Sequence, residues 1–201
     1  MKGIKVVGVG GSMAATSSSL AALKIALAGA EDAGADVELF SIREMNLPFF
    51  VPASPEVPEV ARRFTETAYA AQGLIWCSPT YHAAMSGAFK NALDWFELLR
   101  SREPPYLTDK IIGLISTAGG TTGLQAINTM EFVVRALRGW AIPIMIPIPQ
   151  VWQIFDENGH AIDPNIDRQL RSLGQEVVRA ARQFADDGVS EYAGVGELMQ
   201  E

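Results

Sequence analysis

Flat and polar side chains follow directly after an apolar run in the middle of the chain. The run covers residues 73–77, and the segment behind it, residues 78–95, reads S-P-T-Y-H-A-A-M-S-G-A-F-K-N-A-L-D-W. The four residues at or near its start, Pro79, Thr80, Tyr81 and His82, offer backbone amides, the Thr80 hydroxyl and two flat rings. Such groups could line a planar heteroaromatic ligand and hydrogen-bond its rim. Ordinary surface packing of the two rings is the alternative interpretation.

The local pattern predicts a strand, a loop and a helix around these side chains. Residues 73–77 are short and apolar enough for a buried parallel strand. Pro79 is expected to end that strand, since it has no N–H for the ladder. From Ser86 onward the apolar residues recur at helical spacing, with Lys90 and Asp94 as an i,i+4 pair. In an open parallel sheet, such a loop lies beyond the carboxyl end of its strand, where ligands bind.

A second loop, residues 10–19, is rich in glycine, serine and threonine. Glycines allow close backbone approach, and a helix starting at Ser18 or Ser19 would add free N–H groups and a positive dipole end. The loop contains no Gly-Lys-Ser/Thr, and Met13 stands where a dinucleotide fingerprint needs glycine. It therefore suits a phosphomonoester better than a pyrophosphate. A serine-rich helix cap without a ligand is the alternative interpretation.

A third loop, residues 116–120, reads S-T-A-G-G after another apolar run. Its glycines leave the backbone N–H groups open to a planar ligand. With the segment that begins at Ser78, this loop could frame a heteroaromatic ring.

Five apolar runs alternate with helical patterns, which predicts a parallel α/β sheet with right-handed crossovers. The expected architecture is a flavodoxin-like three-layer sandwich: five strands in the order 2-1-3-4-5 with helices on both faces. Residues 1–188 would form this domain and residues 189–201 an acidic tail. A small hairpin is expected near Asn158-Gly159. The strands are expected at 4–9, 37–40, 73–77, 110–115 and 141–146, and the later helices at 59–71, 86–99, 124–137 and 165–187.

Composition narrows the function classes. The net charge is −7 with no Lys/Arg-rich block, which disfavours nucleic acid and anionic membranes as partners. No apolar run approaches the roughly 20 residues of a membrane span. The single cysteine, Cys77, permits no internal disulfide and is expected to be a buried, inert thiol. Only two histidines are present and no G-x-S-x-G occurs, which disfavours a metal site or a hydrolase. We expect a cytoplasmic protein without membrane insertion.

Taken together, the three loops resemble the NADPH-dependent FMN reductase family of the flavodoxin-like superfamily. The resemblance rests on Gly11-Ser12 with Ser17 and Ser19, on the long motif 78–95, and on residues 116–120. The segment 46–50, N-L-P-F-F, is similar to the part of that family after its second strand. The resemblance runs from the first strand to about residue 185.

The resemblance implies FMN as cofactor and NADPH or NADH as co-substrate. It also implies which residues bind each part of the cofactor. The FMN phosphate would be held by Ser12, Ser17, Ser18 and Ser19, the isoalloxazine lined by Pro79, Thr80, Tyr81 and His82, and its pyrimidine edge contacted by Ser116, Thr117, Ala118, Gly119 and Gly120.

One position departs from the family pattern. Many members carry arginine at the position of Ala14, and residues 10–19 contain no cation. The phosphate would then rest on N–H groups, hydroxyls and the helix end, which implies weaker or exchangeable FMN.

The implied activity is that of an FMN-dependent NAD(P)H oxidoreductase passing a hydride through FMN to a flavin, quinone or similar small acceptor. No catalytic side chain is required, because the cofactor carries the chemistry. His82 could act as a general acid, although a structural role is favoured. The alternative is a flavodoxin-like electron carrier or FMN-binding regulatory module without nicotinamide turnover. The sequence leaves open the choice between NADPH and NADH and the physiological acceptor.

Residues 42–58 form a long loop with four prolines and the apolar group around Phe49 and Phe50. A loop of this length in a compact domain is usually functional or part of an interface. We expect a homodimer or homotetramer in which this loop serves as lid or partner surface, with the partner completing the flavin site.

Overall fold

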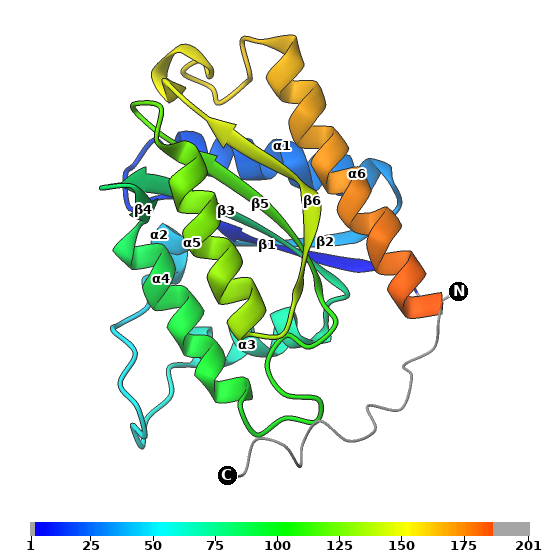
Figure 1. Cartoon of the computed structure of the whole chain (residues 1–201). Helices are drawn as coiled ribbons and strands as arrows, with labels where there is room; N and C mark the ends of the chain where they lie inside the picture. The colour runs from blue at the N-terminus through cyan, green and yellow to red at the C-terminus, as the bar shows by residue number, and fades with distance from the viewer. Residues whose placement is uncertain (1–2, 187–201) are drawn as a thin grey trace.

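Five parallel strands form the centre of the computed structural model, which describes residues 3–186. Their order in the sheet is β2-β1-β3-β5-β6, the order 2-1-3-4-5 expected from the sequence (Figure 1). The strands β3 and β6 are longer than the sequence predicted. Their bounds are β1 Lys5–Gly10, β2 Asp36–Ser41, β3 Gly73–Tyr81, β5 Ile111–Thr117 and β6 Trp140–Ile148.

Helices cover both faces of the sheet, as predicted (Figure 1). On one face, α3, α4 and α5 bury a cluster that includes Phe64, Trp76 and Phe89. On the other face, α1 and α6 bury a cluster that includes Leu23, Leu173 and Val177. Each such large side chain contributes about 1.5–3 kcal/mol when fully buried. The helices are α1 Ser18–Asp32, α2 Ile42–Met45, α3 Glu59–Ala70, α4 Gly87–Asp94, α5 Gly123–Ala136 and α6 Pro164–Asp186, with 3₁₀ turns η1 Trp95–Leu99 and η2 Val151–Gln153.

The close crossing of α1 and α6 depends on glycine. A Cβ at Gly174 would lie 1.9 Å from the carbonyl oxygen of Ala26, and one at Gly29 would lie 2.3 Å from that of Arg171. Both distances are impossible for a real side chain, so these helix backbones touch directly. The contact fixes α1, whose first residues lie beside the loop after β1.

Pro79 does not end its strand, contrary to the prediction. β3 continues to Tyr81, and Pro79 pairs with Thr117 of β5. The ladder between β1 and β3 ends at Gly10 and Cys77, so β3 has an open edge on that side where a missing N–H is tolerated. Beyond Tyr81 the chain turns back into β4, Ala84–Met85, which pairs antiparallel with the end of β3.

Several local predictions are confirmed. The Ser86 hydroxyl caps α4 by accepting from the N–H of Phe89 at 3.2 Å, and Lys90 pairs with Asp94 one turn along that helix. An antiparallel bridge joins Phe155 to Ala161 around the expected hairpin at residues 158–159. The predicted boundary at residue 188 and the tail 189–201 lie outside the described residues.

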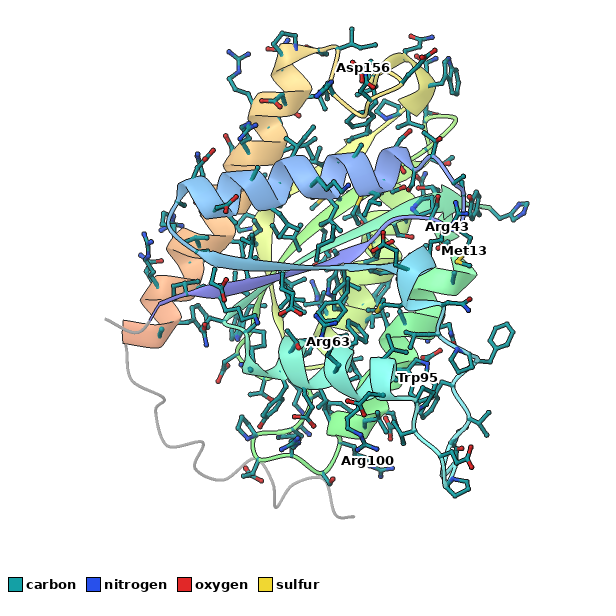
Figure 2. The ribbon with its side chains drawn as sticks, turned by 180° about the vertical axis from the view of Figure 1, so that it is seen from behind. Met13, Arg43, Arg63, Trp95, Arg100 and Asp156 are labelled. Atoms are coloured by element: carbon teal, nitrogen blue, oxygen red, sulfur yellow. The ribbon has the colours of Figure 1, made fainter. Side chains whose placement is uncertain are left out.

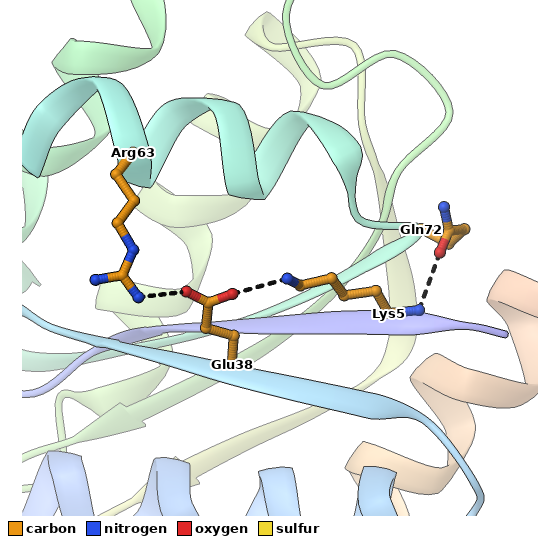
Figure 3. A network of polar contacts seen from close by, with 4 residues as sticks. All are labelled: Lys5, Glu38, Arg63 and Gln72. Atoms are coloured by element: carbon orange, nitrogen blue, oxygen red, sulfur yellow. Dashed lines mark hydrogen bonds and ion pairs between the residues drawn. The ribbon is translucent and has the colours of Figure 1, made fainter.

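A charged network joins β1, β2 and α3 (Figure 3). Lys5 Nζ lies 2.7 Å from Glu38 Oε2, and Arg63 Nη2 lies 2.9 Å from Glu38 Oε1. The Lys5 backbone N–H donates to Gln72 Oε1 at 2.9 Å. The hydrogen bond from Lys5, reinforced by Arg63 against the opposing effect of burial, lowers the pKa of Glu38.

Among residues 3–186, no helix is long and apolar enough to cross a membrane.

Candidate functional site at the carboxyl end of the sheet

The loops after β1, β3 and β5 meet at the carboxyl end of three adjacent strands (Figure 1). Two contacts join them directly. The N–H of Gly11, after β1, donates to the carbonyl of Cys77 in β3 at 3.1 Å. The hydroxyls of Ser19 in α1 and Thr117 in β5 are hydrogen-bonded at 2.6 Å. The three segments predicted to bind FMN therefore share one edge of the sheet.

The helix α1 begins at Ser18, within the predicted start of Ser18 or Ser19, but its cap is the preceding residue, Ser17. Its Oγ accepts hydrogen bonds from the N–H of Leu20 at 3.2 Å and of Ser12 at 3.1 Å. A serine oxygen has two acceptor positions, and both are used. The Ser17 O–H is thus left to donate outward at a helix N-terminus, the arrangement that an anion favours.

The other serines of this loop have separate places. The half-buried Ser12 accepts from the N–H of Ala14 at 3.3 Å through its Oγ. Ser18 is the first residue of α1 and is half-buried. Ser19 is buried and is engaged with Thr117. Ser19 therefore ties the first loop to the third, a contact that no local pattern in the sequence could indicate.

A tight hairpin holds the rings predicted to line the isoalloxazine. Its two turn residues, His82 and Ala83, have φ angles of 50° and 62°. Two positive φ angles in a two-residue loop define a type I′ turn, which usually contains Asn or Gly. Left-handed backbone at other residues costs roughly 1–3 kcal/mol each and is found preferentially at functional sites. Tyr81, just before the turn, is 57% exposed.

Thr80 shows that this wall has an unused polar position. Its Oγ1 is buried and has no hydrogen-bond partner among the described residues. The neighbouring Pro79 is buried. An orphaned buried hydroxyl is costly unless a ligand or water satisfies it.

The loop after β5 presents bare backbone. Gly119 and Gly120 are exposed, and a Cβ at Gly120 would meet nothing within 4 Å. Ser116 and Ala118 are buried below them, and Ser116 Oγ donates to the carbonyl of Gly123 at 2.7 Å. The loop is thus fixed from beneath and open above, which fits the edge of a planar ring.

The segment after β2 forms a separate apolar cleft of about 440 Å³ beside these loops, lined by Met13, Leu47, Phe49, Ala88 and others. The side chain of Asn91 holds its wall, accepting from the N–H of Phe50 at 2.9 Å and donating to the carbonyl of Pro48 at 2.9 Å. Trp95 Nε1 donates to that carbonyl at 3.2 Å. Phe49 is left 86% exposed.

The three loops themselves carry no charged side chain. Residues 11–17, 82–83 and 118–122 contain no Lys, Arg, Asp or Glu. Burial raises the pKa of the Cys77 thiol far above its usual range, which fits the inert thiol predicted from the sequence. Within residues 3–186, no three His, Cys, Asp or Glu side chains are placed to hold a metal ion.

Sequence reasoning missed the segment after β6, which borders the third loop. Ala118 N–H donates to the carbonyl of Ile148 at 2.8 Å, and Val151 N–H donates to the carbonyl of Ala118 at 3.1 Å. The sequence, with prolines at 147 and 149, indicated only irregular chain and a small hairpin for residues 147–164. One signal was available in the sequence: a large aromatic residue, Trp152, in a stretch that favours neither helix nor strand.

A sheet of this order, with loops converging at its switch point, defines a flavodoxin-like protein. An archaeal flavodoxin superposes with a TM-score of 0.63 at 14% identity, covering 89% of this chain and 99% of that one. The flavoenzyme NAD(P)H:(acceptor) oxidoreductase FerB from Paracoccus denitrificans gives 0.71 at 17% identity, covering 90% and 98%. These likenesses establish the fold.

The chain belongs to the NADPH-dependent FMN reductase family, which matches residues 4–153. The NADPH-dependent FMN reductase ArsH of Acidithiobacillus ferrooxidans is 32% identical over 127 residues, 63% of this chain and 52% of that protein. The FMN-dependent NADPH-azoreductase of Staphylococcus aureus is 30% identical over 160 residues, 77% of each chain. The match thus spans only about half the length of the ArsH protein.

Proposed function

We propose that this protein is an FMN-dependent NAD(P)H oxidoreductase that passes a hydride from NAD(P)H through bound FMN to a flavin, quinone or similar small acceptor. Family membership supports the class of reaction. The observation that carries the proposal for this chain is the junction of three loops at one edge of the sheet, tied by the Ser19–Thr117 and Gly11–Cys77 hydrogen bonds.

In this proposal the phosphate lies at the N-terminus of α1. The Ser17 oxygen already accepts hydrogen bonds from two N–H groups, which leaves its O–H as a donor. This O–H would donate to a phosphate oxygen. Ser12 and Ser18 would add hydroxyls, and Ser19 would position the helix through Thr117. With Ala14 in place of a cation, attraction to the phosphate would come from dipoles, without a charge.

The ring would lie between the hairpin and the loop after β5. The hairpin residues Pro79, Thr80, Tyr81 and His82 would line it, with Thr80 Oγ1 gaining the partner that it lacks within the described chain. The loop of Ser116, Thr117, Ala118, Gly119 and Gly120 would meet its pyrimidine edge with backbone N–H groups.

Bound FMN would supply the redox chemistry, taking a hydride at N5 and passing two electrons on. The chain's own part is to hold, orient and polarise. N–H groups at the pyrimidine edge would stabilise negative charge there. His82 is exposed on a strained turn, so we assign it a structural role.

We also propose that the protein forms a homodimer or homotetramer, with residues 46–52 as partner surface. Support comes from the exposed ring of Phe49, held outward by the bonds of Asn91 and Trp95 next to the apolar cleft. Such an exposed apolar feature favours association. Light scattering of the purified protein would test this, and a monomer at micromolar concentration would contradict it.

Anaerobic titration tests the proposed function. The purified protein, supplied with FMN, should show a flavin spectrum that NADPH or NADH bleaches and that an added quinone restores. A bound flavin that reduced nicotinamide does not bleach would indicate an electron carrier or regulatory module instead. Protein that gains no visible absorbance with FMN would contradict both.

A further inference from the structure

Trp152, in η2, has an unusual position for so large an aromatic side chain. It is 62% exposed, and its Cζ3 lies 3.7 Å from the point where a Cβ of Gly119 would stand. Gly119 is one of the exposed glycines of the third loop. An indole is thus displayed to solvent at the rim of the candidate site.

Backbone hydrogen bonds fix the main chain next to Trp152 relative to the loop. The N–H groups of Gln150 and Val151 donate to the carbonyls of Gly120 at 3.3 Å and Ala118 at 3.1 Å. Gln150 has a φ of 45°, a left-handed conformation that directs the chain back over the loop. In Figures 1 and 2, the segment after β6 lies beside the loop after β5 from both sides of the molecule. Trp152 therefore extends from a constrained turn beside Gly119.

The surroundings decide what kind of molecule the indole would receive. Residues 116–122 and 147–155 contain no Lys, Arg, Asp or Glu, and the next charged residues along the chain are Asp156 and Glu157. An exposed indole face offers offset stacking to another planar ring. A negatively charged substituent would find no cation in these two segments. Neutral aromatic compounds fit this rim better than anionic ones.

We propose that Trp152 is the platform on which an uncharged aromatic electron acceptor stacks, next to Gly119. This assignment rests on the proposed function, because it takes residues 116–120 as the edge of the flavin site. It narrows the acceptor from small molecules in general to neutral planar ring compounds, and it makes Trp152 a specificity-determining residue.

Trp140 provides a matched control. It lies at the other end of β6 and is 55% exposed. Its Nε1 donates to Asp109 Oδ1 at 3.2 Å, and its ring contacts Phe184 with centroids 5.6 Å apart. A general loss from removing a surface tryptophan would appear equally in Trp140→Ala.

Binding to the oxidised, FMN-loaded protein without nicotinamide gives a readout that does not depend on turnover. Equilibrium dialysis would use 1,4-naphthoquinone and its 2-sulfonate as probes. Trp152→Ala should weaken naphthoquinone binding about three- to tenfold, Trp152→Phe should stay within about twofold of wild type, and Trp140→Ala should have no effect. The sulfonate should bind more weakly than naphthoquinone to wild type and respond less to Trp152→Ala.

Kinetics should agree. Trp152→Ala should raise KM for 1,4-naphthoquinone by a similar factor and leave reduction of ferricyanide, which has no ring, unchanged. The proposal would be overturned if Trp152→Ala bound naphthoquinone as tightly as wild type, or if Trp152→Ala and Trp140→Ala lost the same amount of naphthoquinone affinity. A change of oligomeric mass on Trp152→Ala would also overturn it, because the indole would then be a subunit contact.

The two hypotheses fail separately. If NADPH bleaches the bound flavin but Trp152→Ala leaves naphthoquinone binding unchanged, the stacking role of Trp152 is wrong and the proposed oxidoreductase activity stands. If the protein binds no FMN but Trp152→Ala still weakens naphthoquinone binding, the proposed function and the acceptor role of Trp152 are both wrong, and only an aromatic binding site at Trp152 is left.

Discussion

The two ends of the parallel sheet are built from different kinds of residue. Toward the amino end, Lys5, Glu38 and Arg63 pair their charges between β1, β2 and α3. At the carboxyl end, the three loops contain no Lys, Arg, Asp or Glu and present hydroxyls, glycines and exposed rings. The charges at one end satisfy each other, whereas at the other end a buried hydroxyl, Thr80 Oγ1, has no partner within the described chain. We infer that the first end serves stability, and we propose that the second is arranged for a ligand.

Left-handed backbone is found at both ends of the sheet. His82, Ala83 and Gln150 have positive φ angles beside the candidate site, and Tyr106, Asp109 and Arg138 have them just before β5 and β6 at the amino end. The side chains, not the backbone, distinguish the two ends: paired charges at one and, at the other, a Thr80 hydroxyl without a partner in the described chain. Substitutions at the carboxyl end should therefore change ligand binding more than stability, and those in the charged network the reverse.

Ser17→Ala should produce the largest change in this comparison. Removing a hydrogen bond to a charged phosphate costs about 1.5–3 kcal/mol, so the Kd for FMN should rise about 10- to 100-fold. Loss of the α1 cap should also lower stability by about 1 kcal/mol. Titration of the apoprotein with FMN measures the first effect and urea unfolding the second.

Ser86→Ala is the control, because Ser86 caps α4 in the same way. It should cost similar stability with little effect on FMN affinity. If both variants bind FMN as wild type does, the phosphate does not lie at Ser17.

Ala14→Arg should have a smaller effect of opposite sign. A cation on this exposed loop would restore the charge that many family members carry, and tighten FMN binding about two- to fivefold at low salt. The gain should fade near 1 M salt, where exposed charges are screened. Ala14→Gln, of similar length without the charge, should show no gain, and a gain equal to that of arginine would refute the electrostatic explanation.

Glu38→Gln should have the smallest effect, confined to stability. The folded-state pKa of Glu38 is lowered, so its contribution is present above the unfolded pKa of about 4.3 and is lost as pH falls through the lower folded value. At pH 7 the variant should lose about 0.5–1 kcal/mol, and the two proteins should converge in strong acid. Urea unfolding across pH measures this.

Glu59→Gln serves for comparison, because Glu59 is 88% exposed and lies 3.8 Å from Arg62. It should change nothing measurable. Altered FMN affinity in Glu38→Gln would break the proposed separation of the two ends.

Local signals predicted most of the fold. Apolar runs marked all five parallel strands, and the serine before Gly87 marked the start of α4. The strand order followed from the alternation of strands and helices. The sequence also indicated which loops lie at the switch point, since both stand out in composition.

What could not be predicted depends on contacts between distant residues. A proline usually breaks a strand ladder. β3 continues through Pro79 because β1 ends before it, so no strand on that side needs the missing N–H. The choice of Ser17 over its neighbours as cap depends on the N–H of Ser12, and the bond from Ser19 to Thr117 spans 98 residues. The position of Trp152 beside Gly119 depends on the pairing of β6 with β5, which brings two distant parts of the chain together.

Amide hydrogen exchange of the apoprotein with and without FMN tests the central claim most directly. FMN should slow exchange in residues 11–19, 79–83 and 118–122, and leave the Lys5, Glu38 and Arg63 network unchanged apart from any global stabilisation. No added protection in these loops, or protection centred at the amino end of the sheet, would contradict the account.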